Sequence, residues 1–131
     1  MISTKRIIGF GDCDPAGVLF FPRVFEFAHT AMENWLREAG VYDEYFLNEE
    51  FAFPLISAQS SYYKPMHPGL EIEVRSSLKE MRESAFSLRT EFFNQEEQLL
   101  SAVDTIHICV SREEGGKQPI PAYLRSILEN L

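Results

Sequence analysis

The chain has 131 residues and a formal net charge of −8. This length predicts a single domain spanning residues 1–131, and the acidic balance disfavours nucleic-acid binding, which requires a basic face. No apolar run is long enough to cross a bilayer, and residues 1–6 lack the hydrophobic stretch of a signal peptide. We therefore expect a cytoplasmic protein with no nucleic-acid or membrane partner.

The N-terminal part of the chain is predicted to contain one strand and one long helix. The strand covers residues 3–10 and ends at Gly11. The helix covers residues 22–39, because Pro22 suits the first helical position and Gly40 suits the position just past the end. Apolar side chains recur along it at helical spacing, namely Val24, Ala28, Ala31, Met32, Trp35 and Leu36. Residues 41–52 indicate a loop or a short helix.

The rest of the chain changes to the period of two that is typical of strands. Strands are predicted at residues 54–64, 70–80, 84–94 and 98–111, followed by a short helix at residues 122–130. Consecutive strands joined by short turns pair antiparallel. One long helix on an antiparallel sheet of about five strands buries both apolar faces most simply, so we expect an α+β fold.

The most informative segment is residues 11–27, GDCDPAGVLFFPRVFEF. It places the carboxylate of Asp14 just ahead of a helix N-terminus, where backbone N–H groups lack partners and carry partial positive charge. A carboxylate and such donors together suit attack on a carbonyl and stabilisation of the resulting oxyanion. The structural alternative is a turn, because Asp before Pro often bonds its own downstream backbone. Gly17 could serve only to allow a positive φ, and Asp12 is interpreted as a turn or capping acid.

The run GDCDPAG, followed by an apolar stretch, an aromatic pair and a long helix, resembles the 4-hydroxybenzoyl-CoA thioesterase family. That family has the hotdog fold, in which a sheet wraps a central helix. The resemblance covers nearly the whole chain, and residues 51–65 also resemble the branch that acts on 1,4-dihydroxy-2-naphthoyl-CoA. It implies an acyl-CoA thioesterase acting on an aromatic acyl group, with no cofactor apart from the CoA of the substrate.

The resemblance also implies roles for three residues of the segment. The family's essential aspartate falls on Asp14, its oxyanion donor falls on the backbone N–H of Phe21, and the glycine that lets the chain approach the thioester falls on Gly17. Phe21 stands where some branches carry a histidine, which excludes acid–base catalysis by His at that position. Whether the carboxylate attacks the thioester directly or deprotonates a water stays open.

Further side chains are candidates for substrate contact. Phe20 could line an aromatic acyl pocket or belong to the core. Ser57 and Gln59 share one face of the strand at 54–64, where they could meet substrate hydroxyls or face water. Arg82 could bind a CoA phosphate, with Ser84 beside it, although the family's basic cluster is reduced here.

The sequence leaves open two functions other than thioester hydrolysis. A hydratase or dehydratase acting on acyl thioesters usually needs a histidine base, and residues 11–27 contain none. A non-catalytic acyl-CoA-binding protein stays possible because the phosphate-binding cluster is weak. A curved sheet leaves open edges, and the family joins them into dimers or tetramers, so we expect a homodimer or homotetramer.

His29, His67 and His107 lack the spacing of metal ligands.

Overall fold

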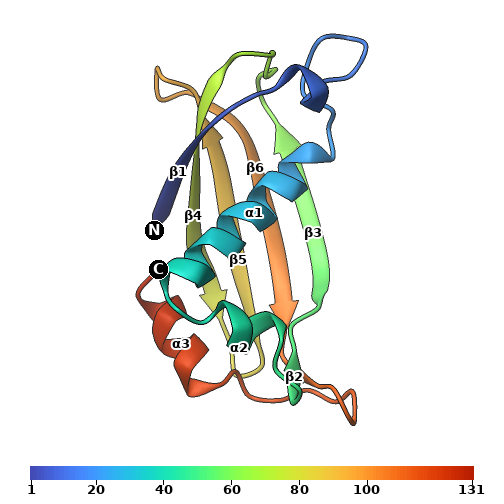
Figure 1. The fold of residues 1–131 in the computed structure, drawn as a ribbon, viewed down its shortest axis with the longest axis vertical. Coiled ribbons are helices and arrows are strands. Elements are labelled where there is room, and N and C mark those ends of the chain that lie inside the picture. Colours follow the sequence, from blue (N-terminus) through green and yellow to red (C-terminus); the bar gives the residue numbers. More distant parts are fainter.

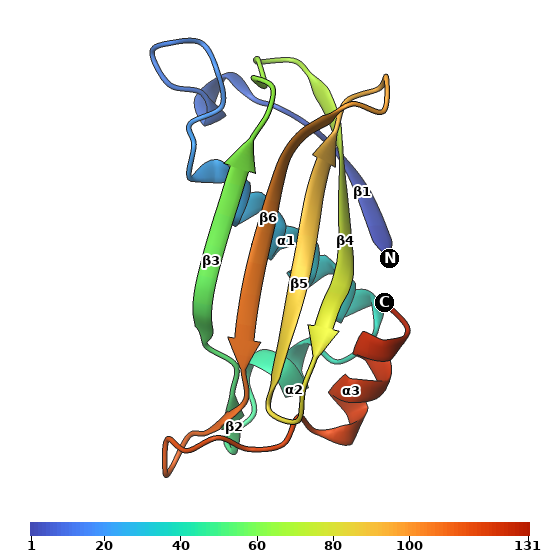
Figure 2. The ribbon, with the colours of Figure 1, turned by 180° about the vertical axis from the view of Figure 1, so that it is seen from behind.

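The computed structural model describes all 131 residues, and its centre is a sheet of five antiparallel strands in the order β1-β4-β5-β6-β3. Helix α1 crosses one face of this sheet, and the opposite face carries no helix (Figures 1 and 2). This is the α+β hotdog arrangement expected from the sequence. The strands of the sheet are β1 (Ile2–Ile7), β3 (Leu55–Tyr62), β4 (Glu71–Met81), β5 (Ala85–Phe93) and β6 (Leu99–Ile108).

Helix α1 (Arg23–Glu38) begins one residue after Pro22 and ends two residues before Gly40, close to the predicted bounds. Gly40 has a φ of +75°, a left-handed conformation that ends helices and favours glycine. The predicted apolar stripe is the buried face of the helix and lies on the sheet. Its buried residues are Val24, Phe27, Ala28, Ala31, Met32, Trp35 and Leu36. No helix of the protein combines the length and the apolar character needed to cross a membrane.

Two predicted strands are shorter in the structure. Strand β1 stops at Ile7, because residues Phe10–Asp12 form a 3₁₀ turn whose start is fixed by a 3.0 Å bond from the Gly9 N–H to Asp12 Oδ2. The predicted strand 98–111 breaks at Cys109. Its last part, β7 (Val110–Ser111), leaves the main sheet and pairs with β2 (Phe51–Ala52).

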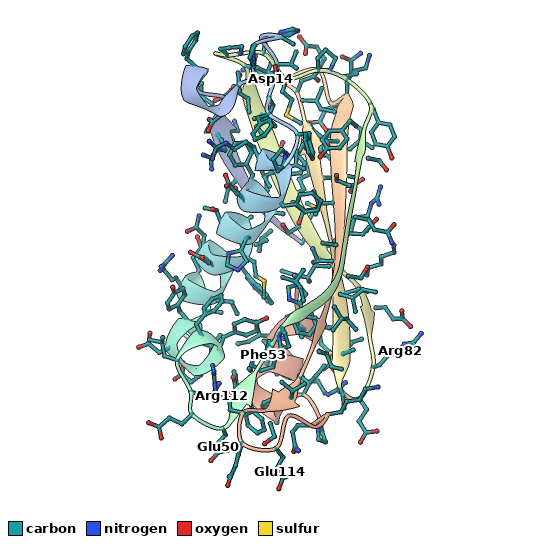
Figure 3. The ribbon with its side chains drawn as sticks, turned by 90° about the vertical axis from the view of Figure 1, so that its right-hand side faces the viewer. Asp14, Glu50, Phe53, Arg82, Arg112 and Glu114 are labelled. Atoms are coloured by element: carbon teal, nitrogen blue, oxygen red, sulfur yellow. The ribbon has the colours of Figure 1, made fainter.

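Two small helices close the end of the molecule that lies away from Asp14 (Figures 1 and 3). They are α2 (Tyr42–Phe46) and α3 (Ala122–Glu129). The buried side chains fall into two clusters. The cluster nearer Asp14 includes Leu19, Val24, Val74 and Phe92, and the cluster at the far end includes Trp35, Leu36, Phe86, Leu124 and Leu128.

A buried histidine makes the stability of this fold depend on pH. His107 is 3% exposed, its ring stacks on Phe86 with centroids 4.8 Å apart, and its Nε2 lies 3.0 Å from Thr105 Oγ1. Burial lowers the pKa of His107 to about 4, and the positive charge that His29 can carry adds to the effect. The unfolded chain therefore binds a proton at His107 between about pH 6.5 and pH 4, and the folded chain does not.

We expect this difference to lower the free energy of unfolding by about 3 kcal/mol as the pH falls through that window. The variant His107→Gln has no titrating ring and keeps a polar partner for Thr105. Urea unfolding of both proteins at pH 7 and pH 4 measures the effect, and the wild type should lose more stability than the variant. An equal loss in the two proteins would show that His107 is not responsible.

Candidate active site

Asp14 begins a tight turn that is closed by backbone hydrogen bonds. The Gly17 N–H donates to the Asp14 carbonyl at 2.9 Å, and the Asp14 N–H donates to the Val18 carbonyl at 2.9 Å. Gly17 has a φ of +80°, so the turn needs a residue that tolerates the left-handed region. The Ala16 N–H donates to Asp14 Oδ1 at 2.9 Å. The structural role predicted for Asp14 is therefore present, and it uses one carboxylate oxygen and leaves Oδ2 without a partner.

The turn is held by the loop that follows β3 and by Asp12 just before it. The Leu19 N–H donates to the Met66 carbonyl at 2.8 Å, and the Phe20 N–H donates to the Asp12 carbonyl at 2.9 Å. The imidazole of His67 lies on the turn, with Nδ1 3.1 Å from the Gly17 carbonyl oxygen. Because a carbonyl can only accept, Nδ1 carries the proton in this contact. His67 is thus a neighbour of the Asp14 turn that the sequence spacing did not reveal.

The start of α1 leaves the amide of Phe21 free beside the turn. The Arg23 N–H donates to the Phe20 carbonyl at 2.9 Å, and the Phe25 N–H donates to the Pro22 carbonyl at 3.1 Å. The N–H of Phe21 has no hydrogen-bond partner in the chain. It lies at the positive end of a 16-residue helix, where the helix dipole favours negative charge. An oxyanion is the kind of group that such a donor stabilises.

Asp14 and Phe21 line the same open cavity of about 380 Å³. Its other walls are Val18 and Leu19 from the turn and a run at the end of β3, comprising Tyr62, Tyr63, Lys64, Pro65 and Met66. Figure 3 shows Asp14 at one end of the molecule, over the end of the sheet. One cavity is thus lined by a residue whose carboxylate can act as a base or nucleophile and by a residue whose unpaired backbone amide can act as an oxyanion donor.

The other predicted contact residues lie elsewhere. The Phe20 ring is 45% exposed, and it packs edge-on against Phe21 at 5.4 Å rather than lining the cavity. Ala58 faces α1, so its neighbours Ser57 and Gln59 point to the opposite face of the sheet. Their roles stay predictions, and within one chain they are not part of the Asp14 cavity.

Arg82 and Ser84 line a different cavity, of about 490 Å³, on the uncovered face. Figure 3 shows Arg82 near the end of the molecule opposite to Asp14. The Arg82 guanidinium is exposed and pairs with Glu80 at 2.9 Å. A single chain therefore does not bring these two residues to Asp14, and their predicted role depends on a second subunit.

A further cavity of about 400 Å³ lies between α1 and the sheet. Phe25 and His29 line it from α1, and Ala58, Thr105 and His107 line it from the strands. Phe21, Phe25 and His29 are spaced four residues apart, so helical periodicity could have placed His29 on the same face as the candidate site. His107 could not be found in this way, because its position depends on the pairing of β6 with β3 and β5. No three His, Cys, Asp or Glu side chains converge as metal ligands do.

Comparison with known proteins places these features in a family. A family model described as the thioesterase-like superfamily matches residues 8–128. The 1,4-dihydroxy-2-naphthoyl-CoA hydrolase of Thermosynechococcus vestitus is 29% identical over 130 residues, covering 95% of this chain and 89% of that protein. The enzyme of the same name from Crocosphaera subtropica is 28% identical over 110 residues, covering 82% and 80%.

The fold agrees with a solved relative. The crystal structure of a 1,4-dihydroxy-2-naphthoyl-CoA thioesterase from Synechocystis matches with a TM-score of 0.87 at 26% identity, covering 98% of this chain and 96% of that one. The resemblance of residues 11–27 to thioesterases is thus confirmed at the level of the superfamily. The relatives are named for 1,4-dihydroxy-2-naphthoyl-CoA, the substrate of the branch that residues 51–65 resemble. The chain belongs to the thioesterase-like superfamily.

Proposed function

We propose that this protein hydrolyses the CoA thioester of an aromatic acid. The first candidate substrate is 1,4-dihydroxy-2-naphthoyl-CoA, on which the relatives named above act, and 4-hydroxybenzoyl-CoA is the second. The observation that carries the proposal is the shared cavity of Asp14 and Phe21, because it pairs an acid with an unpaired amide at a helix start.

The proposed reaction follows from these two groups. The thioester carbonyl oxygen accepts a hydrogen bond from the Phe21 N–H, which stabilises the negative charge that develops when the carbonyl carbon is attacked. Asp14 either attacks this carbon to form an anhydride that water then hydrolyses, or removes a proton from an attacking water. In both routes the carbon–sulfur bond breaks, CoA leaves as its thiol after protonation, and one water is consumed.

We propose that the reaction uses no cofactor and no metal, since a thioester is already a good electrophile. We also propose a cytoplasmic location. Cys13 and Cys109 are both free thiols, which suits a reducing compartment.

The test is a hydrolysis panel with the purified protein. The substrates are the CoA esters of benzoic, 4-hydroxybenzoic, 1,4-dihydroxy-2-naphthoic and hexanoic acids, and thiol release is followed with a thiol-reactive dye. We expect the highest kcat/KM for a hydroxylated aromatic ester. Higher kcat/KM for the hexanoyl ester would contradict the proposed substrate class, and no release from any ester would contradict hydrolysis.

A second function, hydration of an enoyl thioester, is favoured by one observation. His67 contacts the Gly17 carbonyl, so an imidazole touches the turn that carries Asp14. Crotonyl-CoA in the same panel separates the two functions. Loss of the enoyl absorbance without thiol release would indicate a hydratase.

We propose in addition that the enzyme is a homodimer built along β3. This strand is an edge of the sheet, because it pairs with β6 on one side only, and Figure 2 shows its other side uncovered. A second copy of β3 that pairs antiparallel would continue the sheet and remove the open edge. The partner's strands would then run in the opposite direction. The end of its sheet that carries Arg82 and Ser84 would lie toward the Asp14 end of the first subunit, where these two residues could contact CoA.

Light scattering at micromolar concentration tests the assembly. The chain has a mass of 15.1 kDa, and we expect a species of at least twice that mass. A monomer would contradict the dimer and would leave Arg82 and Ser84 without a route to the substrate.

A further inference from the structure

The carbonyl of Phe21 is left out of the hydrogen bonds of α1. The helix would ordinarily use it as an acceptor for the Phe25 N–H, but that N–H bonds to the Pro22 carbonyl at 3.1 Å. The Phe21 carbonyl instead accepts a hydrogen bond of 2.6 Å from the phenol of Tyr62, which lies 41 residues further along the chain. This contact ties the helix start to the end of β3.

Tyr62 is well placed to hold that contact. Its backbone is at the end of β3 opposite Ser101, and the next residue continues the pairing through a 2.8 Å bond from the Tyr63 N–H to the Leu100 carbonyl. The Ser60 hydroxyl donates to the Tyr62 oxygen at 2.8 Å. The phenol thus accepts from Ser60 and donates to Phe21, and such a chain of hydrogen bonds strengthens each member.

We propose that Tyr62 is a positioning residue for the oxyanion donor, an inference that rests on the proposed thioesterase function. The carbonyls on both sides of the Phe21 N–H are then fixed, that of Phe20 by the Arg23 N–H and that of Phe21 by the Tyr62 phenol. The backbone at Phe21 cannot rotate without breaking one of these bonds. The free N–H therefore keeps one direction, and it belongs to a residue that lines the same cavity as Asp14 and Tyr62. Catalysis depends on donors held in this way.

The variant Tyr62→Phe removes the hydrogen bond and keeps the ring. We expect kcat for aryl-CoA hydrolysis to fall about tenfold, less than the 10²–10³-fold that loss of an oxyanion donor itself costs, with KM within about twofold, because the donor acts mainly in the transition state. Ser60→Ala should lower kcat by about two- to threefold, because it removes only the bond that supports the phenol. The pH dependence of kcat should keep its wild-type shape.

The matched control is Tyr123→Phe. The Tyr123 phenol also donates to a backbone carbonyl, that of Glu44 at 2.9 Å, but α3 and α2 lie at the opposite end of the molecule (Figure 1). This variant loses the same kind of bond and should retain kcat within about twofold. Circular dichroism of all variants confirms that they are folded before kinetics are compared.

A second measurement separates this inference from the proposed function. In protein labelled with ¹⁵N-phenylalanine, the Phe21 amide signal is identified by its loss in Phe21→Leu. We expect Tyr62→Phe to shift or broaden it and Tyr123→Phe to leave it unchanged, whether or not any thioester is hydrolysed. An unchanged signal, an unchanged kcat, a rise in KM alone, or loss of one limb of the pH profile would each overturn the positioning role. Absence of hydrolysis by the wild type would overturn only the proposed function.

Discussion

Replacing Asp14 by Asn is expected to lower kcat for aryl-CoA hydrolysis by about 10²–10⁴-fold, the range that a general base or its equivalent supplies. The amide oxygen of Asn can still accept the hydrogen bond that the Ala16 N–H gives to Oδ1. The turn should therefore survive, while the negative charge needed to attack the thioester or to deprotonate water is lost. Steady-state hydrolysis of the best substrate in the panel measures the change.

Asp12→Asn is the matched control, because it makes the same acid-to-amide change two residues away. Asp12 Oδ2 accepts from the Gly9 N–H at 3.0 Å, and its backbone carbonyl accepts from the Phe20 N–H. An Asn side chain can keep the first bond and does not alter the second, so kcat should stay within about threefold of the wild type. Equal losses in the two variants would show that charge in the turn, and not the Asp14 carboxylate itself, supports turnover.

Replacing Phe92 by Ala is expected to lower the free energy of unfolding by about 3–5 kcal/mol, the usual cost of removing a buried phenylalanine ring. Phe92 has no exposed surface and belongs to the core cluster nearer Asp14. The loss combines the transfer of a large apolar group from water with the cavity that its removal leaves. Urea or thermal unfolding of the purified variant gives the value.

Phe93→Ala tests whether burial is the cause. Phe93 is the next residue of β5 and points to the other face of the sheet, where the Arg75 guanidinium lies over its ring at 4.1 Å. Phe93 is only partly buried, so its removal loses this contact and less apolar area than removal of Phe92, and we expect a smaller cost of about 2 kcal/mol. Similar costs for the two substitutions would show that the side of the sheet does not matter.

The elements of the fold could be predicted because their signals are local. The apolar stripe of α1, its flanking Pro22 and Gly40, and the period of two in the later strands give bounds within a few residues of those observed. The breaks at Ile7 and Cys109 were missed. The first depends on a hydrogen bond from the Gly9 N–H to the Asp12 carboxylate, and the second depends on β7 pairing with β2, a contact across more than 50 residues.

The residues of the candidate site also differ in whether their contacts are local in the sequence. Asp14, Gly17 and Phe21 lie in one short segment, so their common location could be inferred from sequence and a resemblance. Tyr62 and His67 reach this segment from more than 40 residues away, through contacts with the carbonyls of Phe21 and Gly17. No spacing in the sequence encodes such contacts, because they depend on where β3 ends and on the loop that follows it.

The position of Tyr62 on an edge strand has a consequence for regulation. The strand that is open to a second copy of the chain is also the strand that holds the Phe21 carbonyl. Any ligand, mutation or change of concentration that alters β3 would alter the geometry of the candidate site without touching Asp14. In the dimer proposed above, turnover per chain should therefore follow the state of association, and inhibitors that bind at the proposed β3 interface would act on catalysis from outside the substrate cavity.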